Sequence, residues 1–170
     1  GPIKWQPTRT PSQSATTPFN SGLGGEPPGA ERVMARILLL DIDGVVKSLE
    51  GAPWSIPGSD WKRGVQDFLA WCQQNFDVVM VLSSWQAEIH RELATLGVCL
   101  PSLAWKRTKT DGLAGLCRPG NQVIWVEDGW EAEDREIAQT LGIRLVETEF
   151  NEHLSVTQDK IRRAMEPTSG

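Results

Sequence analysis

The sequence contains no tyrosine, only two histidines and only three cysteines, although it has eight tryptophans. The cysteines, Cys72, Cys99 and Cys117, are widely spaced and form no C-x-x-C pair. Cysteines scattered in this way cannot assemble a zinc site of the usual ligand spacing with two histidines. We therefore expect reduced thiols in a cytoplasmic protein, and we expect any metal ion to be bound by oxygen ligands.

Long apolar segments and an excess of positive charge are also missing. The longest apolar runs, 37–40 and 78–82, are far too short to cross a bilayer, and no secretory signal is recognisable, so we expect no membrane partner. The formal charge of −5 argues against a protein that binds nucleic acid by bulk electrostatic attraction. An enzyme that acts on a nucleic-acid end is still compatible with this charge.

The remaining composition is that of an ordinary globular domain. The chain has 170 residues, of which 39% are hydrophobic and 23% are charged, enough for one core but not for two full-sized domains. Residues 1–33 differ from the rest because they contain six prolines, five glycines and many Ser and Thr without an apolar period. We predict a flexible tail or linker over 1–33 and one folded domain over 34–170.

Strand-like and helix-like patterns alternate from Met34 onward. Continuous apolar runs predict buried strands at 36–40, 78–82, 98–100, 122–126 and 143–146. Helical spacing and capping residues predict helices over 60–76, 86–96, 110–116 (capped by Thr110), 131–141 and 155–165 (capped by Ser155). The alternation predicts an α/β fold: a doubly wound, Rossmann-like, mostly parallel sheet with helices on both faces.

Polar residues stand at the ends of these strands, where open α/β sheets bind their ligands. Asp41 and Asp43 follow the first strand, and carboxylates at positions i and i+2 of extended chain point to the same side. Gly44 then permits a sharp exit from the strand. Two carboxylates spaced in this way are common in solvated turns. They indicate a functional site only if the other strand ends carry matching residues.

The other strand ends carry matching chemistry. Ser83 and Ser84 follow the second strand, Lys109 precedes the strand 122–126, and Glu127 and Asp128 follow that strand. Two acidic pairs at neighbouring strand ends would repel each other unless a cation lies between them. Carboxylate oxygens suit Mg²⁺, so we predict a magnesium site at this edge of the sheet.

These segments resemble the motifs of the haloacid dehalogenase (HAD) superfamily. The run Leu38–Val45 resembles the first motif, Val81–Ser84 the second, Lys109 the third and Val126–Asp128 the fourth. The order and spacing agree from about residue 36 to residue 165. Membership would imply a magnesium-dependent phosphatase.

The resemblance implies a role for each catalytic residue. Asp41 would attack phosphorus and form an aspartyl-phosphate intermediate, and Asp43 would protonate the leaving oxygen and then deprotonate water. Ser83 would hydrogen-bond a phosphoryl oxygen, and Lys109 would neutralise developing charge. Lys106 also precedes the strand 122–126 and is the alternative to Lys109.

The resemblance also implies the ligands of the metal ion. These are an oxygen of Asp41, the backbone carbonyl of Asp43 and the last acidic pair. Many relatives have Asp-Asp where this chain has Glu127-Asp128. We expect Asp128 to bind directly, with Glu127 acting through water as one possible arrangement.

Two further residues are candidates for substrate binding. Trp54 belongs to the loop 51–60, which should lie over the site as the family's flap. There, Trp54 would either stack on a substrate or simply anchor the loop. Ser84 would contact substrate or only start the following helix. With Trp85 directly after the second motif, the chain resembles small bacterial HAD domains that have a Trp at this place, including some found with RNA-repair proteins.

The intervals between motifs are too short for the cap domain of relatives that act on small metabolites. We therefore predict an uncapped phosphohydrolase with an accessible or macromolecular phosphomonoester as substrate, such as a nucleic-acid 3′-phosphate. The alternatives are a phosphatase of nucleotides or other small phosphorylated metabolites, and a non-catalytic module that is phosphorylated on aspartate or only binds a partner.

Overall fold

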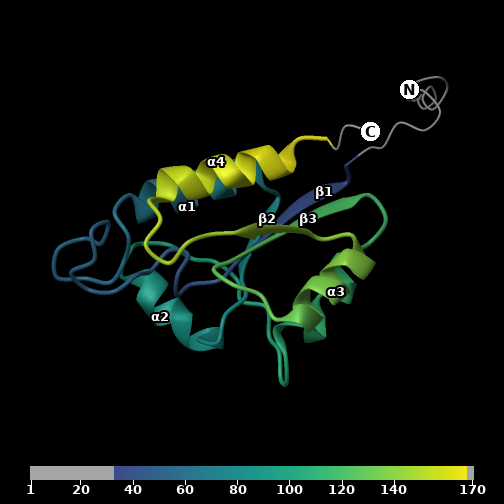
Figure 1. The fold of residues 1–170 in the computed structure, drawn as a ribbon, viewed down its shortest axis with the longest axis horizontal. Helices are drawn as coiled ribbons and strands as arrows, with labels where there is room; N and C mark the ends of the chain where they lie inside the picture. The colour runs from purple at the N-terminus through teal and green to yellow at the C-terminus, as the bar shows by residue number, and fades with distance from the viewer. Residues whose placement is uncertain (1–32, 168–170) are drawn as a thin grey trace, which may run out of the picture. The chain divides into compact units, whose positions relative to one another are not determined.

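The four strands of the sheet are all parallel and are ordered β2-β1-β3-β4 (Figure 1). The structure is a computed structural model that describes residues 33–167. The strands are β1 Ala35–Leu40, β2 Val78–Val81, β3 Asn121–Glu127 and β4 Arg144–Glu147. The predicted parallel α/β sheet is therefore confirmed. The predicted tail, apart from Val33, lies outside the described residues.

Helices connect the strands in chain order. The α-helices are α1 Val65–Asn75, α2 Ile89–Ala94, α3 Ala132–Leu141 and α4 Leu154–Met165. Short 3₁₀ helices are η2 Gln86–Glu88, η3 Lys109–Gly112 and η4 Ala114–Leu116. Within the described range, no helix has both the length and the apolar character that a bilayer crossing needs.

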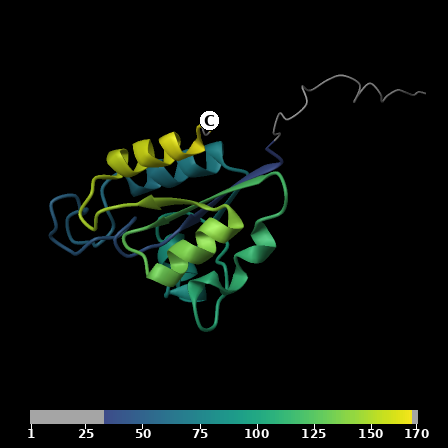
Figure 2. The same ribbon diagram turned by 45° about the vertical axis from the view of Figure 1, so that its right-hand side comes forward.

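Alternate residues of β1 point into two separate cores. Leu38 and Leu40 belong to a core that includes buried residues of α1 and α4, whereas Ile37 and Leu39 belong to a second core with Ala138 of α3. Helices α1 and α4 lie side by side on one face of the sheet, and α3 lies on the opposite face (Figures 1 and 2). The apolar runs are continuous because these strands are buried on both faces.

The predicted strand at 98–100 is wrong. This segment is irregular chain, and only Ser102 forms an isolated bridge to Val81. The backbone of Val81 instead bonds the chain on either side of that bridge, accepting from Leu103 and donating to Pro101. Proline has no N–H for a regular ladder, and Cys99 is exposed, so the segment has little reason to become a strand.

Several helix boundaries also differ from the sequence prediction. Helix α1 begins at Val65 rather than 60, because Gly64 adopts a left-handed conformation (φ 80°) just before it. The segment 86–96 divides into η2 and α2. Two predicted capping residues are likewise displaced.

Both displaced caps lie two residues upstream of the predicted position. The cap of η3 is Thr108 instead of Thr110, in a reciprocal capping box with Asp111. The cap of α4 is His153 instead of Ser155, because its Nδ1 accepts the backbone N–H of Ser155 at 3.0 Å. In each case the residue two positions earlier makes the local bond that satisfies the helix start.

Candidate active site

Three carboxylates meet at the carboxyl ends of β1 and β3. Asp41 follows β1, Glu127 ends β3, and Asp128 comes next; each offers an oxygen, and these oxygens lie within 4.8 Å of one another. The parallel register creates this proximity, because Leu40 pairs with Val126 and the backbone N–H of Asp41 donates to the Val126 carbonyl. Asp41 and Glu127 are buried, whereas Asp128 is more exposed.

Lys109 is the cation that faces this cluster. Its Nζ lies 2.8 Å from Glu127 Oε2 and 3.3 Å from Asp41 Oδ1. Burial alone would lower the pKa of Lys109, but the two carboxylates outweigh burial and raise it, so the ammonium stays charged. Lys106 is exposed. The structure thus brings Lys109, and not Lys106, to the carboxylates.

The cluster holds more negative charge than Lys109 can balance. Burial raises the pKa of Glu127 to about 8, and Asp41 adds to this effect, although Lys109 and Trp125 donate hydrogen bonds to the carboxylate. Burial also raises the pKa of Asp41 against the opposing effects of Lys109 and the Ile42 N–H. Burial thus disfavours the ionised form of both carboxyl groups, and clustered groups with perturbed pKa values are candidates for a functional site.

Gly44 lets Asp128 approach the loop that follows β1. It has φ 82°, and a Cβ atom built there would lie 2.2 Å from Asp128 Oδ2. Its carbonyl accepts the Thr148 hydroxyl at 3.0 Å, and the N–H of Thr148 donates to the Glu127 carbonyl. Any other residue at position 44 would therefore displace a carboxylate of the cluster, in addition to straining the turn.

Asp43 lies apart from the three clustered carboxylates. Its side chain is exposed, and Oδ2 accepts the indole N–H of Trp85 at 3.2 Å. Ser83 lies at the neighbouring strand end and is 1% exposed. Its hydroxyl accepts the backbone N–H of Trp85 at 3.1 Å, and its carbonyl accepts the indole N–H of Trp105.

The structure does not bring the two candidate substrate contacts into the cluster. Ser84 is exposed at the turn that leads into η2. Trp54 is 42% exposed, and its ring meets that of His153 edge-on at a centroid separation of 4.8 Å. This contact ties the flap loop to the start of α4, which is the anchoring interpretation of Trp54.

Sequence reasoning missed four residues around the site. Trp125 donates to Glu127 Oε2 at 3.0 Å, Trp85 donates to Asp43, Lys47 lies buried beneath the loop, and Lys62 is wholly buried. Trp125 and Glu127 are two residues apart on one strand, so their shared face could have been read from the sequence. A lysine inside an apolar run, as in Val45-Val46-Lys47, was the only local signal for Lys47.

No protein-family model matches the sequence, and comparisons with curated proteins and with solved structures give no match either. Function is therefore inferred from the chemistry of the site.

Proposed function

We propose that this chain is a magnesium-dependent phosphohydrolase of the HAD type, with an uncapped, doubly wound domain and an aspartyl-phosphate intermediate. One observation carries the proposal: Asp41, Glu127 and Asp128 converge at one edge of the sheet with Lys109 as their cation. Three carboxylates and one ammonium leave net negative charge, which suits a divalent cation and, beside it, a phosphoryl group.

The residues present fit Mg²⁺. Asp41 and Asp128 would hold the ion directly, and the backbone carbonyl of Asp43 is a further candidate ligand. Glu127 Oε2 already accepts hydrogen bonds from Lys109 and Trp125, which favours a contact through its other oxygen or through water. Bound there, the ion would offset the carboxylate charge and polarise the phosphoryl group.

Asp41 has one oxygen engaged and one available. Both the Ile42 N–H, at 2.8 Å, and Lys109 contact Oδ1, which leaves Oδ2 to attack phosphorus. The new bond joins Oδ2 to phosphorus as the bond from phosphorus to the leaving oxygen breaks. Asp43 gives its proton to that oxygen. Lys109 and the Ser83 hydroxyl would stabilise charge on the phosphoryl oxygens.

The second half of the reaction reverses the role of Asp43. Its carboxylate takes a proton from water as the water oxygen attacks phosphorus, and the bond between phosphorus and Asp41 breaks. The products are inorganic phosphate and free Asp41, so the enzyme returns to its starting state. A cytoplasmic location, a macromolecular substrate such as a nucleic-acid 3′-phosphate, and substrate contacts from Ser84 and Trp54 belong to this same proposal.

Hydrolysis of p-nitrophenyl phosphate tests the proposal. We expect turnover with Mg²⁺, no turnover with chelator, and no turnover for Asp41→Asn, because an amide is a poor nucleophile of the same shape. Asp159→Asn, on the exposed surface of α4, is the control and should keep wild-type activity. Wild-type turnover by Asp41→Asn would contradict the nucleophile.

Asp43→Asn distinguishes a phosphatase from a module that only stores phosphate. A phosphatase should lose at least 10²-fold in turnover, on the order of 3 kcal/mol, and should accumulate phosphorylated Asp41 because water attack is slowed. Stable phosphorylation of the wild-type chain without turnover would instead indicate the receiver-like alternative.

A further inference from the structure

The carboxylate of Asp43 is tied to the next strand end by one side chain. Trp85 donates its indole N–H to Asp43 Oδ2 at 3.2 Å, across 42 positions of sequence. The backbone N–H of Trp85 is itself fixed by the Ser83 hydroxyl at 3.1 Å. The indole therefore extends from a well-anchored backbone position at the end of β2 to the exposed carboxylate after β1.

A buried lysine holds the ring of Trp85. Lys47 is 2% exposed, and its Nζ lies 4.7 Å from the centroid of the Trp85 ring and 4.6 Å from that of Trp61. Such cation–π contacts are strongest when the ammonium is desolvated, as it is here. The carbonyl of Lys47 also accepts the N–H of Gly44 at 2.8 Å, so one residue orders both the turn after Asp43 and the indole that contacts Asp43.

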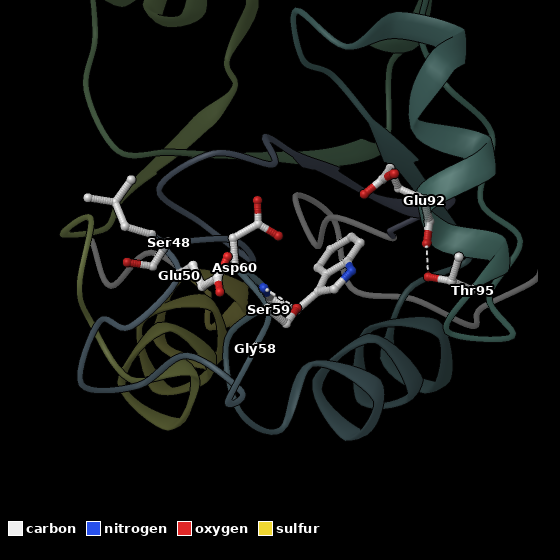
Figure 3. A pocket seen from close by; sticks show the side chains of 9 residues that line it. Ser48, Glu50, Gly58, Ser59, Asp60, Glu92 and Thr95 are labelled. Atoms are coloured by element: carbon white, nitrogen blue, oxygen red, sulfur yellow. Dashed lines mark hydrogen bonds between the residues drawn. The ribbon is translucent and has the colours of Figure 1, made fainter.

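Lys47 is in turn held by two carboxylates. Its Nζ forms ion pairs with Glu92 at 2.8 Å and with Asp60 at 3.2 Å. Both residues line a hollow of about 460 Å³ between the flap loop and α2 (Figure 3). Burial lowers the pKa of Lys47, but hydrogen bonds and ion pairs with these carboxylates more than offset burial and raise it. The ammonium beside the indole therefore stays charged at neutral pH.

We propose that Trp85 is a positioning residue for Asp43, and that Lys47 fixes Trp85 for this task. The inference rests on the proposed function, in which Asp43 transfers a proton to the leaving oxygen. With Oδ2 held by the indole, the side chain loses its rotational freedom and Oδ1 is presented to the substrate. A phenyl ring would keep an aromatic face over Lys47, although a weaker one than indole, but it has no N–H, so only the indole can bond Asp43.

The dependence of rate on the leaving group reports this role. An alkyl alcohol is a poor leaving group unless its oxygen is protonated, whereas 2,4-dinitrophenolate leaves without a proton. Loss of a well-placed acid therefore slows alkyl phosphates selectively, and general damage to the fold slows all esters alike. We would measure kcat/KM with saturating Mg²⁺ for a series of phosphate monoesters between these two extremes.

Trp85→Phe removes the N–H and keeps an aromatic ring. We expect kcat/KM to fall about tenfold or more for alkyl phosphates and by less than about twofold for 2,4-dinitrophenyl phosphate. Asp43→Asn should show the same selectivity to a greater extent. Trp61→Phe is the matched control, because Trp61 faces the same ammonium without contacting Asp43; any loss it causes should be equal for all esters.

The outcomes separate the inference from the function on which it rests. An equal loss across the series for Trp85→Phe, or faster alkyl hydrolysis, would overturn the positioning role alone. A wild-type chain that hydrolyses no ester, or an Asp43→Asn variant without selectivity, would overturn the proposed function and the inference with it. If Trp85→Phe does not fold, the indole N–H resonance of Trp85 should still shift in Asp43→Ala, and an unchanged resonance would contradict the contact.

Discussion

Lys62 is wholly buried, and across residues 33–167 its ammonium has no hydrogen-bond partner. Burial lowers its pKa to about 8, although the charges of Glu152 and Asp128 act in the opposite direction. A lysine whose pKa is depressed on folding destabilises the folded state wherever it must be charged. The destabilisation is complete below about pH 8 and declines as the pH rises toward 10.5, where the unfolded lysine also loses its proton.

We predict that Lys62→Met raises the free energy of unfolding at pH 7 by about 1 to 3 kcal/mol. The gain over wild type should shrink between pH 8 and 10, and urea denaturation at several pH values measures it. Lys160→Met is the control with the opposite sign, because Lys160 forms an ion pair with Glu152 at 2.6 Å. A lower stability of Lys62→Met at pH 7 would show that the ammonium is well paired.

Among single residues, the sequence predicts site residues that lie at strand ends. It does not predict the roles of residues that depend on contacts with distant parts of the chain. Asp41, Glu127 and Asp128 could be grouped because parallel strands end at one edge of a sheet. The contact of Trp85 with Asp43 spans 42 positions, and that of Lys47 with Glu92 spans 45. No local pattern specifies such pairs, and a buried lysine has no periodic signature.

The element that carries Lys109 is a single 3₁₀ turn, and its start is set by one carboxylate. Asp111 Oδ2 accepts the backbone N–H groups of Lys106, Arg107 and Thr108 at 3.0, 2.8 and 3.3 Å. These bonds lower the pKa of Asp111 to about 2. A turn of four residues has almost no helical stability of its own, so the capping box is what holds η3 in place.

We predict that Asp111→Ala lowers kcat/KM several-fold with little change in the melting temperature, because it loosens the turn that presents Lys109 but leaves both cores intact. Asp111→Asn keeps an acceptor oxygen and should remain close to wild type. Steady-state kinetics with thermal denaturation of both variants tests this. Equal activity of Asp111→Ala and wild type would show that Lys109 is held by its ion pairs alone.

Elements with a strong pattern were predictable, and their ends were not. The four strands appear where the apolar runs place them, and the two central strands, β1 and β3, have the longest buried runs because helices cover both faces of the sheet. The starts of η3 and α4 depend on Asp111 and His153, whose side chains bond backbone groups in ways that several nearby residues could have matched.

For the molecule as a whole, the acidic edge of the sheet makes stability depend on pH and, under the proposed function, on metal. The pKa of Glu127 is about 8 in the folded state and its ordinary value is 4.5. Between these values the folded chain holds a proton that the unfolded chain has lost, so the metal-free protein loses stability as the pH rises through this window. Under the proposed function, Mg²⁺ would bind the ionised carboxylate and so would oppose that loss.

We predict that Mg²⁺ raises the melting temperature more at pH 8.5 than at pH 6. Glu127→Gln cannot ionise, so it should flatten the pH dependence of the metal-free protein and reduce the effect of Mg²⁺. Differential scanning calorimetry with Mg²⁺ or with chelator measures both effects. A metal-induced increase that does not vary with pH would contradict the assignment of the raised pKa to the metal site.

One hollow in the described part of the chain offers apolar side chains to a substrate. A hollow of about 530 Å³ lies between the flap loop and the loop that joins β4 to α4, and its lining includes Trp54, Phe150, His153 and Val156. Trp54, Phe150 and Val156 are among the few large apolar residues that are exposed in the described chain. Aromatic rings exposed in this way can stack nucleobases without reading their sequence.

We therefore predict that a 3′-phosphorylated oligonucleotide is hydrolysed with a higher kcat/KM than sugar phosphates. The substrates should be compared at one fixed salt concentration, because the chain is acidic and salt screens its repulsion of the oligonucleotide. Trp54→Ala should raise KM for the oligonucleotide about fivefold or more, the effect of one lost stacking contact of about 1 kcal/mol, and leave glycerol phosphate unaffected. Leu49→Ala, at an exposed residue just before the flap loop and outside this hollow, is the control. A preference for a sugar phosphate by tenfold or more, about 1.4 kcal/mol, would exclude the macromolecular substrate. The aromatic hollow would then contribute nothing to transition-state binding. The proposed phosphatase chemistry of Asp41 would be unaffected by that result.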